Sequence, residues 1–213
     1  MTERGMIFNS EMVRAILDGR KTQTRRIIKL SHERGMLNPV IKGRNGEITS
    51  VSCRLAPLLC PFGQPEDRIW VRETWAEAGA SAPDLKLYRA NYPDHVPSHY
   101  ENVPPVDEIR WKPSIHMPRW ASRILLEITD VRVERLNAIS QVDAIAEGAP
   151  PSHPSIDCVS QEYGFPDFSR SWFGQTWQHI YGEESWQANP WVWVIEFKRI
   201  DELEGRLATE VAS

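Results

Sequence analysis

The segment Gly19–Arg26, with the sequence Gly-Arg-Lys-Thr-Gln-Thr-Arg-Arg, places an amine, two hydroxyls and three guanidiniums within eight residues. A lysine close to a threonine hydroxyl can act as a base and nucleophile pair, provided that the ammonium loses its proton. Lys21 and Thr24 are the candidates for that pair. The alternative interpretation is a solvated basic turn, because short motifs match by chance.

The flanking residues predict the elements that hold this segment. Residues 10–18 carry apolar side chains at helical spacing, with Ser10 able to cap the first turn and Gly19 able to end the helix. The run from Thr24 to Ile28 then favours a strand. The segment is therefore expected to connect a helix to a strand, where a rigid scaffold positions polar side chains.

A carboxylate at the end of a second predicted helix is the next candidate. The pattern of residues 136–148 is helical, Ser140 and Asp143 approximate a capping box, and Gly148 stops the helix. Glu147 thus lies at the C-terminal end, where the macrodipole disfavours a carboxylate unless a cation compensates. Such a carboxyl group suits proton transfer, whereas the alternative is a solvated glutamate of the last turn.

The remaining pattern predicts an α+β fold with more strands than helices. Strands are expected at residues 6–8, 68–75, 124–133 and 190–198, with a short one at 85–88. In residues 169–181, a helix with a core face is indicated by Trp172, Phe173, Trp177 and Ile180. Strands and helices do not alternate regularly, which favours a mixed, mostly antiparallel sheet curling into a barrel with flanking helices.

We expect one domain over residues 1–200, with long insertions near residues 31–63, 78–120 and 149–188. The polar tail at residues 201–213 is expected to fray.

Composition narrows the function classes. The 213 residues are 41% hydrophobic and include nine tryptophans, which indicates a packed core. The net charge of -4 does not indicate nucleic-acid binding. Residues 14–34 hold seven Lys/Arg against two acidic residues, a local charge of +5 that suits a phosphate or a solvated face.

Cysteine usage and hydropathy point to a cytoplasmic protein. Cys53, Cys60 and Cys158 form an odd set without a zinc-site spacing and without a preceding signal peptide, so we expect reduced thiols. No metal and no cofactor is predicted. No apolar run approaches the roughly 20 residues that cross a bilayer, so no membrane partner is expected.

Three blocks together resemble a known family. They are Ile16–Thr24 with Arg26, the pattern L-x-x-I-S-x-x-x-A-x-x-E from Leu136 to Glu147, and Val194–Lys198. In this order they resemble the ASCH-domain family of PUA-like β-barrels, and its small bacterial N4-acetylcytidine amidohydrolases in particular. The whole chain is similar to the longer ASCH proteins of phages and prophages, and the compact enzymes correspond to about half of it.

The resemblance implies a catalytic group of Lys21, Thr24 and Glu147. Thr24 would attack the acyl carbonyl, Lys21 would take the hydroxyl proton, and Glu147 would protonate the departing exocyclic nitrogen of cytosine. The roles of Lys21 and Glu147 could be exchanged, or water could attack directly. Arg26 is the candidate for contact with the oxyanion or the substrate.

Further substrate-binding candidates lie between these blocks. Arg72, Glu73 and Trp75 are expected to line the cleft, with Trp75 or Trp120 stacking on a pyrimidine. His116 lies in a loop rich in tryptophan and proline and is a candidate for the same cleft.

The resemblance also leaves functions of other classes open. PUA-like barrels often bind RNA, which makes RNA a possible partner, and RNA-cleaving ASCH proteins exist. A phage accessory protein acting through contacts alone is a further alternative. The sequence does not indicate an oligomeric state.

Overall fold

The computed structural model describes residues 1–29, 38–42, 45–52, 54–79, 82, 84–100 and 103–200. They divide into two compact units, each assembled from segments far apart in the chain. The first unit combines residues 1–19, 68–127 and 199–200, and the second combines residues 20–67 and 128–198. The fold is mixed α+β with a mostly antiparallel sheet. The predictions for Cys53 and for the tail lie outside the described residues.

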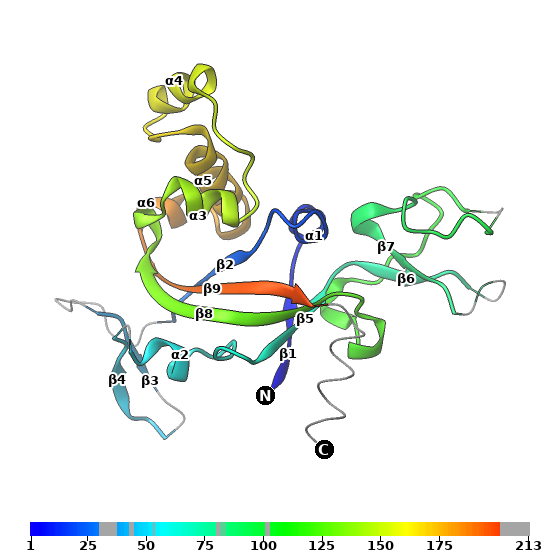
Figure 1. Cartoon of the computed structure of the whole chain (residues 1–213), viewed down its shortest axis with the longest axis horizontal. Coiled ribbons are helices and arrows are strands. Elements are labelled where there is room, and N and C mark those ends of the chain that lie inside the picture. Colours follow the sequence, from blue (N-terminus) through cyan, green and yellow to red (C-terminus); the bar gives the residue numbers. More distant parts are fainter. Residues whose placement is uncertain are drawn as a thin grey trace. The chain divides into compact units, whose positions relative to one another are not determined.

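The first unit is built on three strands in the order β1-β5-β8 (Figure 1). They are β1 (Glu3–Ile7), β5 (Arg68–Arg72) and the first residues of β8 (Leu125–Arg135). β5 pairs in parallel with β1 and antiparallel with β8. Gly5 faces Trp70 in the β1–β5 register, and a Cβ at Gly5 would lie 2.6 Å from the indole ring. This position therefore requires a residue without a side chain.

The predicted strand at residues 68–75 is two strands. β5 ends at Arg72, and β6 (Trp75–Glu77) forms a separate hairpin with β7 (Lys86–Tyr88). The chain leaves the sheet at Glu73, whose backbone N–H donates to the Met117 sulfur at 3.3 Å. The short strand predicted at residues 85–88 is confirmed by β7.

Helix α1 (Ser10–Leu17) begins one residue after its cap. The Asn9 side chain accepts a hydrogen bond from the Met12 backbone N–H at 2.8 Å, so the prediction of Ser10 as the cap is wrong. Asn9 has the extended backbone that a capping residue needs, whereas Ser10 is already helical. Gly19 follows the helix with φ +74°, as predicted.

The described residues of this unit also contain three short 3₁₀ turns. They are η1 (Arg89–Asn91), η2 (Ser114–His116) and η3 (Arg119–Ala121). A small core of Trp75, Tyr88, Met117 and Ala121 packs the hairpin against the turns.

The second unit continues with the strand order β8-β9-β2. β2 (Gln23–Ile27) pairs antiparallel with β9 (Trp191–Ile200), with Arg25 opposite Val194. The described part of the predicted 31–63 insertion holds a hairpin and a short helix. These are β3 (Val40–Lys42), β4 (Ile48–Ser50) and α2 (Ala56–Leu59). Across the described ranges, the strands do not close into the expected barrel.

Helical segments lie on one side of β9 and β2 in the second unit, with α4 in an outer layer packed on α5 (Figure 1). They are η4 (Leu136–Ala138), α3 (Gln141–Ala146), α4 (Pro154–Glu162), α5 (Phe168–Tyr181) and α6 (Glu184–Gln187). The predicted capping box of α3 is confirmed, since Ser140 and Asp143 satisfy each other's backbone N–H groups.

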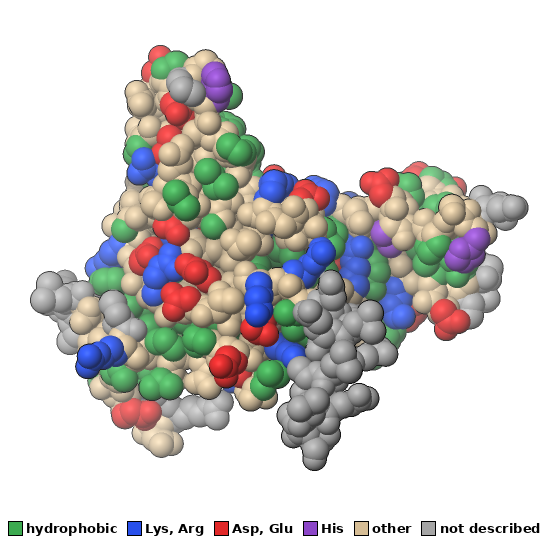
Figure 2. Space-filling view, in the orientation of Figure 1, with side chains coloured by type: hydrophobic (Ala, Val, Ile, Leu, Met, Phe, Trp, Pro, Cys, Tyr) green, Lys and Arg blue, Asp and Glu red, His purple; other side chains and the backbone are tan. Residues whose placement is uncertain are grey.

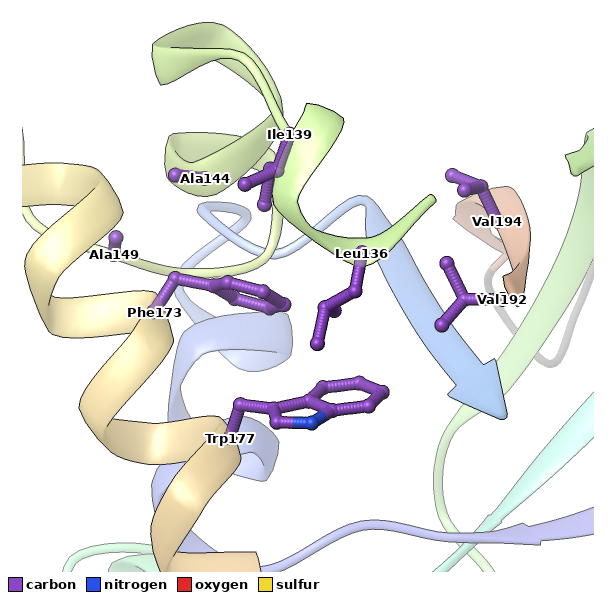
Figure 3. Packing of buried hydrophobic residues seen from close by; sticks show 8 residues of the cluster. All are labelled: Leu136, Ile139, Ala144, Ala149, Phe173, Trp177, Val192 and Val194. Atoms are coloured by element: carbon purple, nitrogen blue, oxygen red, sulfur yellow. The ribbon is translucent and has the colours of Figure 1, made fainter. Parts of the chain in front are cut away.

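Figure 3 shows the core between these layers, where the rings of Phe173 and Trp177 point from α5 toward Leu136 and β9. Ile180, assigned to the same face by helical spacing, is 43% exposed, so that prediction is wrong. Ile180 lies in the last turn of α5, where the Tyr181 ring, and not Ile180, packs on Trp177 at 4.4 Å between ring centroids. The burial of Phe173 and Trp177 fixes α5, and thereby the neighbouring α3, on this unit.

Candidate active site

Three successive residues before β2 bond to three successive carbonyl oxygens at the end of α3. The hydrogen bonds run from Thr22 N to Ala146 O at 2.8 Å, from Lys21 Nζ to Glu147 O at 2.9 Å, and from Arg20 Nη1 to Gly148 O at 2.9 Å. They satisfy carbonyl groups that a helix end leaves without partners, and the cations oppose the negative end of the macrodipole. The basic segment is thus a cap for α3 as well as a connection.

Lys21 and Glu147 form a buried ion pair within this cap. Lys21 Nζ donates to Glu147 Oε2 at 2.7 Å, and the two side chains are 0% and 3% exposed. Desolvation lowers the pKa of the Lys21 ammonium, the charge and hydrogen bond of Glu147 oppose that shift, and the charges of Arg26 and Arg25 add to it. The amine is therefore closer to losing its proton than an exposed lysine is.

The second carboxylate oxygen of Glu147 accepts a hydrogen bond from Arg25. Arg25 Nη1 donates to Glu147 Oε1 at 3.1 Å and to Gln23 Oε1 at 2.6 Å, while Nη2 donates to Glu134 Oε2 at 3.1 Å. Asp143 Oδ2 lies 3.6 Å from the same Nη2. Both carboxylate oxygens of Glu147 are thus held by cations that approach from β2 and its entry loop.

Arg25 is surrounded by a partly exposed network of ion pairs and hydrogen bonds. At its centre, Arg132 of β8 contacts carboxylates of three elements: Glu134, Glu196 and Asp143. Gln23 Nε2 adds donated bonds to Asp143 at 3.0 Å and to Glu196 at 3.3 Å. Figure 2 shows basic and acidic side chains gathered over this part of the second unit. The network joins β2, β8, β9 and α3 around the buried pair.

Thr24 and Arg26 occupy the alternate positions of β2. Because side chains of a strand alternate between faces, they lie on the face opposite Gln23 and Arg25. Thr24 is 2% exposed, and among the described residues its hydroxyl makes no hydrogen bond to Lys21 or Glu147. The Arg26 charge nevertheless acts on Lys21 and lowers its pKa. The structure therefore brings the side chains of Lys21 and Glu147 together. Thr24 is close to Lys21 in the sequence, but in the described part of the chain its hydroxyl is not hydrogen-bonded to either side chain.

The other predicted substrate-binding residues belong to the first unit. Arg72 donates to the Ile115 carbonyl, and Glu73 accepts from Arg123 Nε at 2.9 Å and Nη2 at 3.0 Å. Burial raises the pKa of Glu73, and Arg123 opposes that shift. Arg72 and Glu73 thus bind other residues of the first unit, which gives both of them a structural role there.

The predicted aromatic and histidine contacts also lie in the first unit. Trp75 is 2% exposed and meets Trp120 edge-on at 5.4 Å between ring centroids. Trp120 is 62% exposed, so its ring, unlike that of Trp75, offers surface for stacking. His116 is exposed in the turn η2.

The local basic charge is only partly a surface feature. Lys21 and Arg25 are buried and ion-paired, so they cannot contribute to a basic patch for RNA. Arg34 lies outside the described residues. Residues 14–34, with their local charge of +5, therefore favour nucleic-acid binding less than the sequence alone indicates.

Sequence reasoning missed Arg25 as the second partner of Glu147, together with its support by Gln23 and Asp143. The signal was present in part, because Gln23 and Arg25 are two residues apart in β2 and a strand places such residues on one face. The resemblance includes Arg26 and does not include Arg25.

The part of the chain that the structure describes contains no helix able to span a membrane. Nor do the described His, Cys, Asp and Glu residues group in threes or more to hold a metal ion. Comparison of the chain with models of known families, with curated proteins and with solved structures finds no match.

The arrangement has a defined chemical capacity. An amine and a carboxylate 2.7 Å apart share a proton along one hydrogen bond, and burial lowers the pKa of the Lys21 amine. Transfer of that proton yields a neutral amine beside a carboxylic acid, which are a base and an acid in one site.

Proposed function

We propose that this chain is an amidohydrolase that removes the acyl group from N4-acetylcytidine or a related N4-acylcytosine nucleoside. The proposal includes membership of the ASCH family with its PUA-like fold, and a cytoplasmic location with a free nucleoside as substrate. It requires no metal or cofactor, because amine, alcohol and acid supply the base, nucleophile and proton donor.

The buried Lys21–Glu147 pair is the observation that carries the proposal. The two residues are 126 positions apart in the sequence, and the motif resemblance implies that both belong to one catalytic group. An ion pair without a function is an expensive way to hold a helix end, because both charges must be desolvated. Perturbed ionisable groups of this kind are concentrated at functional sites.

The proposed reaction proceeds through an acyl-enzyme. The Thr24 hydroxyl oxygen attacks the acyl carbon while the neutral Lys21 amine accepts the hydroxyl proton, and a tetrahedral oxyanion forms. The bond from the acyl carbon to N4 then breaks, and N4 takes a proton from Glu147, so that cytidine leaves. The proton on Lys21 then passes to Glu147, which restores the base and the acid. Water attacks the acyl carbon of the threonine ester while Lys21 accepts a proton from it, the bond from the acyl carbon to Thr24 Oγ breaks, and Oγ takes a proton from Glu147. The carboxylic acid leaves, and return of the proton from Lys21 to Glu147 regenerates the enzyme.

The test is to incubate the full-length protein with N4-acetylcytidine and follow the ultraviolet spectrum as cytidine forms. We expect turnover that is lost in Lys21→Ala and Glu147→Ala. Asp130→Asn, which changes an exposed carboxylate of the second unit, is the control and should keep activity. Absence of turnover by the wild-type protein refutes the proposal.

The nucleophile is tested separately with Thr24→Ser and Thr24→Val. Loss of turnover in Thr24→Val with retention in Thr24→Ser supports attack by the hydroxyl. Retention in both assigns the attack to a water molecule activated by Lys21. Salt-dependent binding to RNA without any turnover favours the RNA-binding alternative.

A further inference from the structure

We infer that Arg25 is a positioning residue that holds Glu147 in register with Lys21. The inference rests on the proposed function for its kinetic consequences, but the contact between Arg25 and Glu147 can be tested without activity. Arg25 is not part of the motif resemblance, and its role emerges only from the contacts of its guanidinium.

The guanidinium is committed to the protein rather than to a substrate. Nη1 and Nη2 contact Glu147, Gln23, Glu134 and Asp143, and the side chain is fully buried. Of its nitrogens, only Nε lacks an acceptor within the described part of the chain. Arg25 thus acts through Glu147.

The contact with Oε1 fixes the plane of the Glu147 carboxylate, whose other oxygen accepts from Lys21. A carboxylate held by one bond can rotate about its terminal torsion, which is broad for glutamate. With Arg25 on Oε1 and Lys21 on Oε2, the carboxylate plane is fixed from both sides. The planar fork of arginine suits this task, because it can serve Glu147 and Glu134 at once, whereas a lysine presents a single point charge.

Arg132 provides a matched control. It shares Glu134 and Asp143 with Arg25 and is also an arginine of the second unit, but within the described residues it makes no contact with Glu147. Loss of Arg132 should therefore weaken the supporting network and leave the Lys21–Glu147 hydrogen bond in place.

The experiment compares Arg25→Gln, Arg25→Lys and Arg132→Gln with the wild type for kcat and KM on N4-acetylcytidine. We expect kcat to fall about tenfold to a hundredfold in Arg25→Gln with KM unchanged, because a displaced catalytic group lowers the rate and not substrate binding. Arg25→Lys should recover part of kcat, and Arg132→Gln should stay within about twofold of the wild type.

Two kinetic results overturn the inference. An Arg25→Gln variant that changes only KM places the residue at the substrate. An equal loss of kcat in Arg132→Gln means that the whole network, and not Arg25, determines the rate.

If the wild-type protein shows no turnover, the proposed function is refuted. The contact between Arg25 and Glu147 is then tested by melting temperatures. Arg25→Gln, Glu147→Gln and the double variant form a cycle. A double variant destabilised by clearly less than the sum of the single losses supports the contact between Arg25 and Glu147. Strictly additive losses overturn it.

Discussion

Glu147→Gln should make the stability of the second unit depend on pH in the alkaline range. The substitution keeps the size of the side chain and removes the carboxylate charge that compensates Lys21. Lys21 is then a fully buried ammonium beside Arg25 and Arg26, whose charges both lower its pKa. We expect the variant to fold with Lys21 as the neutral amine, because that state costs the least free energy.

The cost follows from the proton that must be released. An unfolded lysine titrates near pH 10.4, and each pH unit below that value costs about 1.36 kcal/mol for deprotonation. The variant should therefore lose up to about 4 kcal/mol at about pH 7.4 but only about 1.4 kcal/mol at about pH 9.4. The sign is fixed because the folded variant binds fewer protons than the unfolded chain, so its stability rises with pH.

Urea unfolding at a series of pH values, with wild type and variant side by side, measures this difference. Asp130→Asn is the control, because Asp130 is about half exposed and lies 3.8 Å from Arg132, so its loss should cost below about 1 kcal/mol at every pH. A cost of Glu147→Gln that is the same at every pH would refute the assignment of Lys21 as the buried cation.

Three further predictions concern the scaffold of the second unit, each checked by urea unfolding. Gly174→Ala should destabilise by about 1–3 kcal/mol, because a Cβ there would lie 2.6 Å from the Phe165 ring; unchanged stability would contradict this packing. Ser140→Ala should cost about 1 kcal/mol through loss of the cap to Asp143, and a neutral effect would argue against the capping box. Leu136→Ala should cost about 2–5 kcal/mol as a fully buried core truncation, and a loss below that range would place Leu136 outside the core.

Local patterns predicted the elements well where periodicity was strong. The helix ended by Gly19, the capping box at Ser140 and the apolar strand β9 all follow from side-chain spacing and from turn residues. Errors arose where tertiary contacts decide the local structure. The strand at residues 68–75 breaks at Glu73, whose backbone N–H donates to the Met117 sulfur and whose carboxylate accepts from Arg123. These partners are 44 and 50 residues away, and no local pattern encodes such contacts.

The site was predictable only in part. The pairing of Lys21 with Glu147 was indicated by the resemblance alone, since no spacing rule relates residues separated by 126 positions. Arg25 could have been found from the alternation of β2, but its partner on α3 could not. The described strands do not close into a barrel, and closure could not be predicted because strand order, unlike strand existence, is set by long-range packing.

The three bonds between residues 20–22 and the last carbonyls of α3 make the site sensitive to chain length at one place. Inserting a single residue between Gly19 and Gln23 would shift the amine by one Cα step, about 3.8 Å, and move it out of reach of its acid. The strands β3 and β4 pair with each other, so this hairpin should accept added or deleted residues far more readily. Natural or engineered variants of this chain should therefore differ in length around β3 and β4, while the count of residues from Gly19 to Gln23 stays constant.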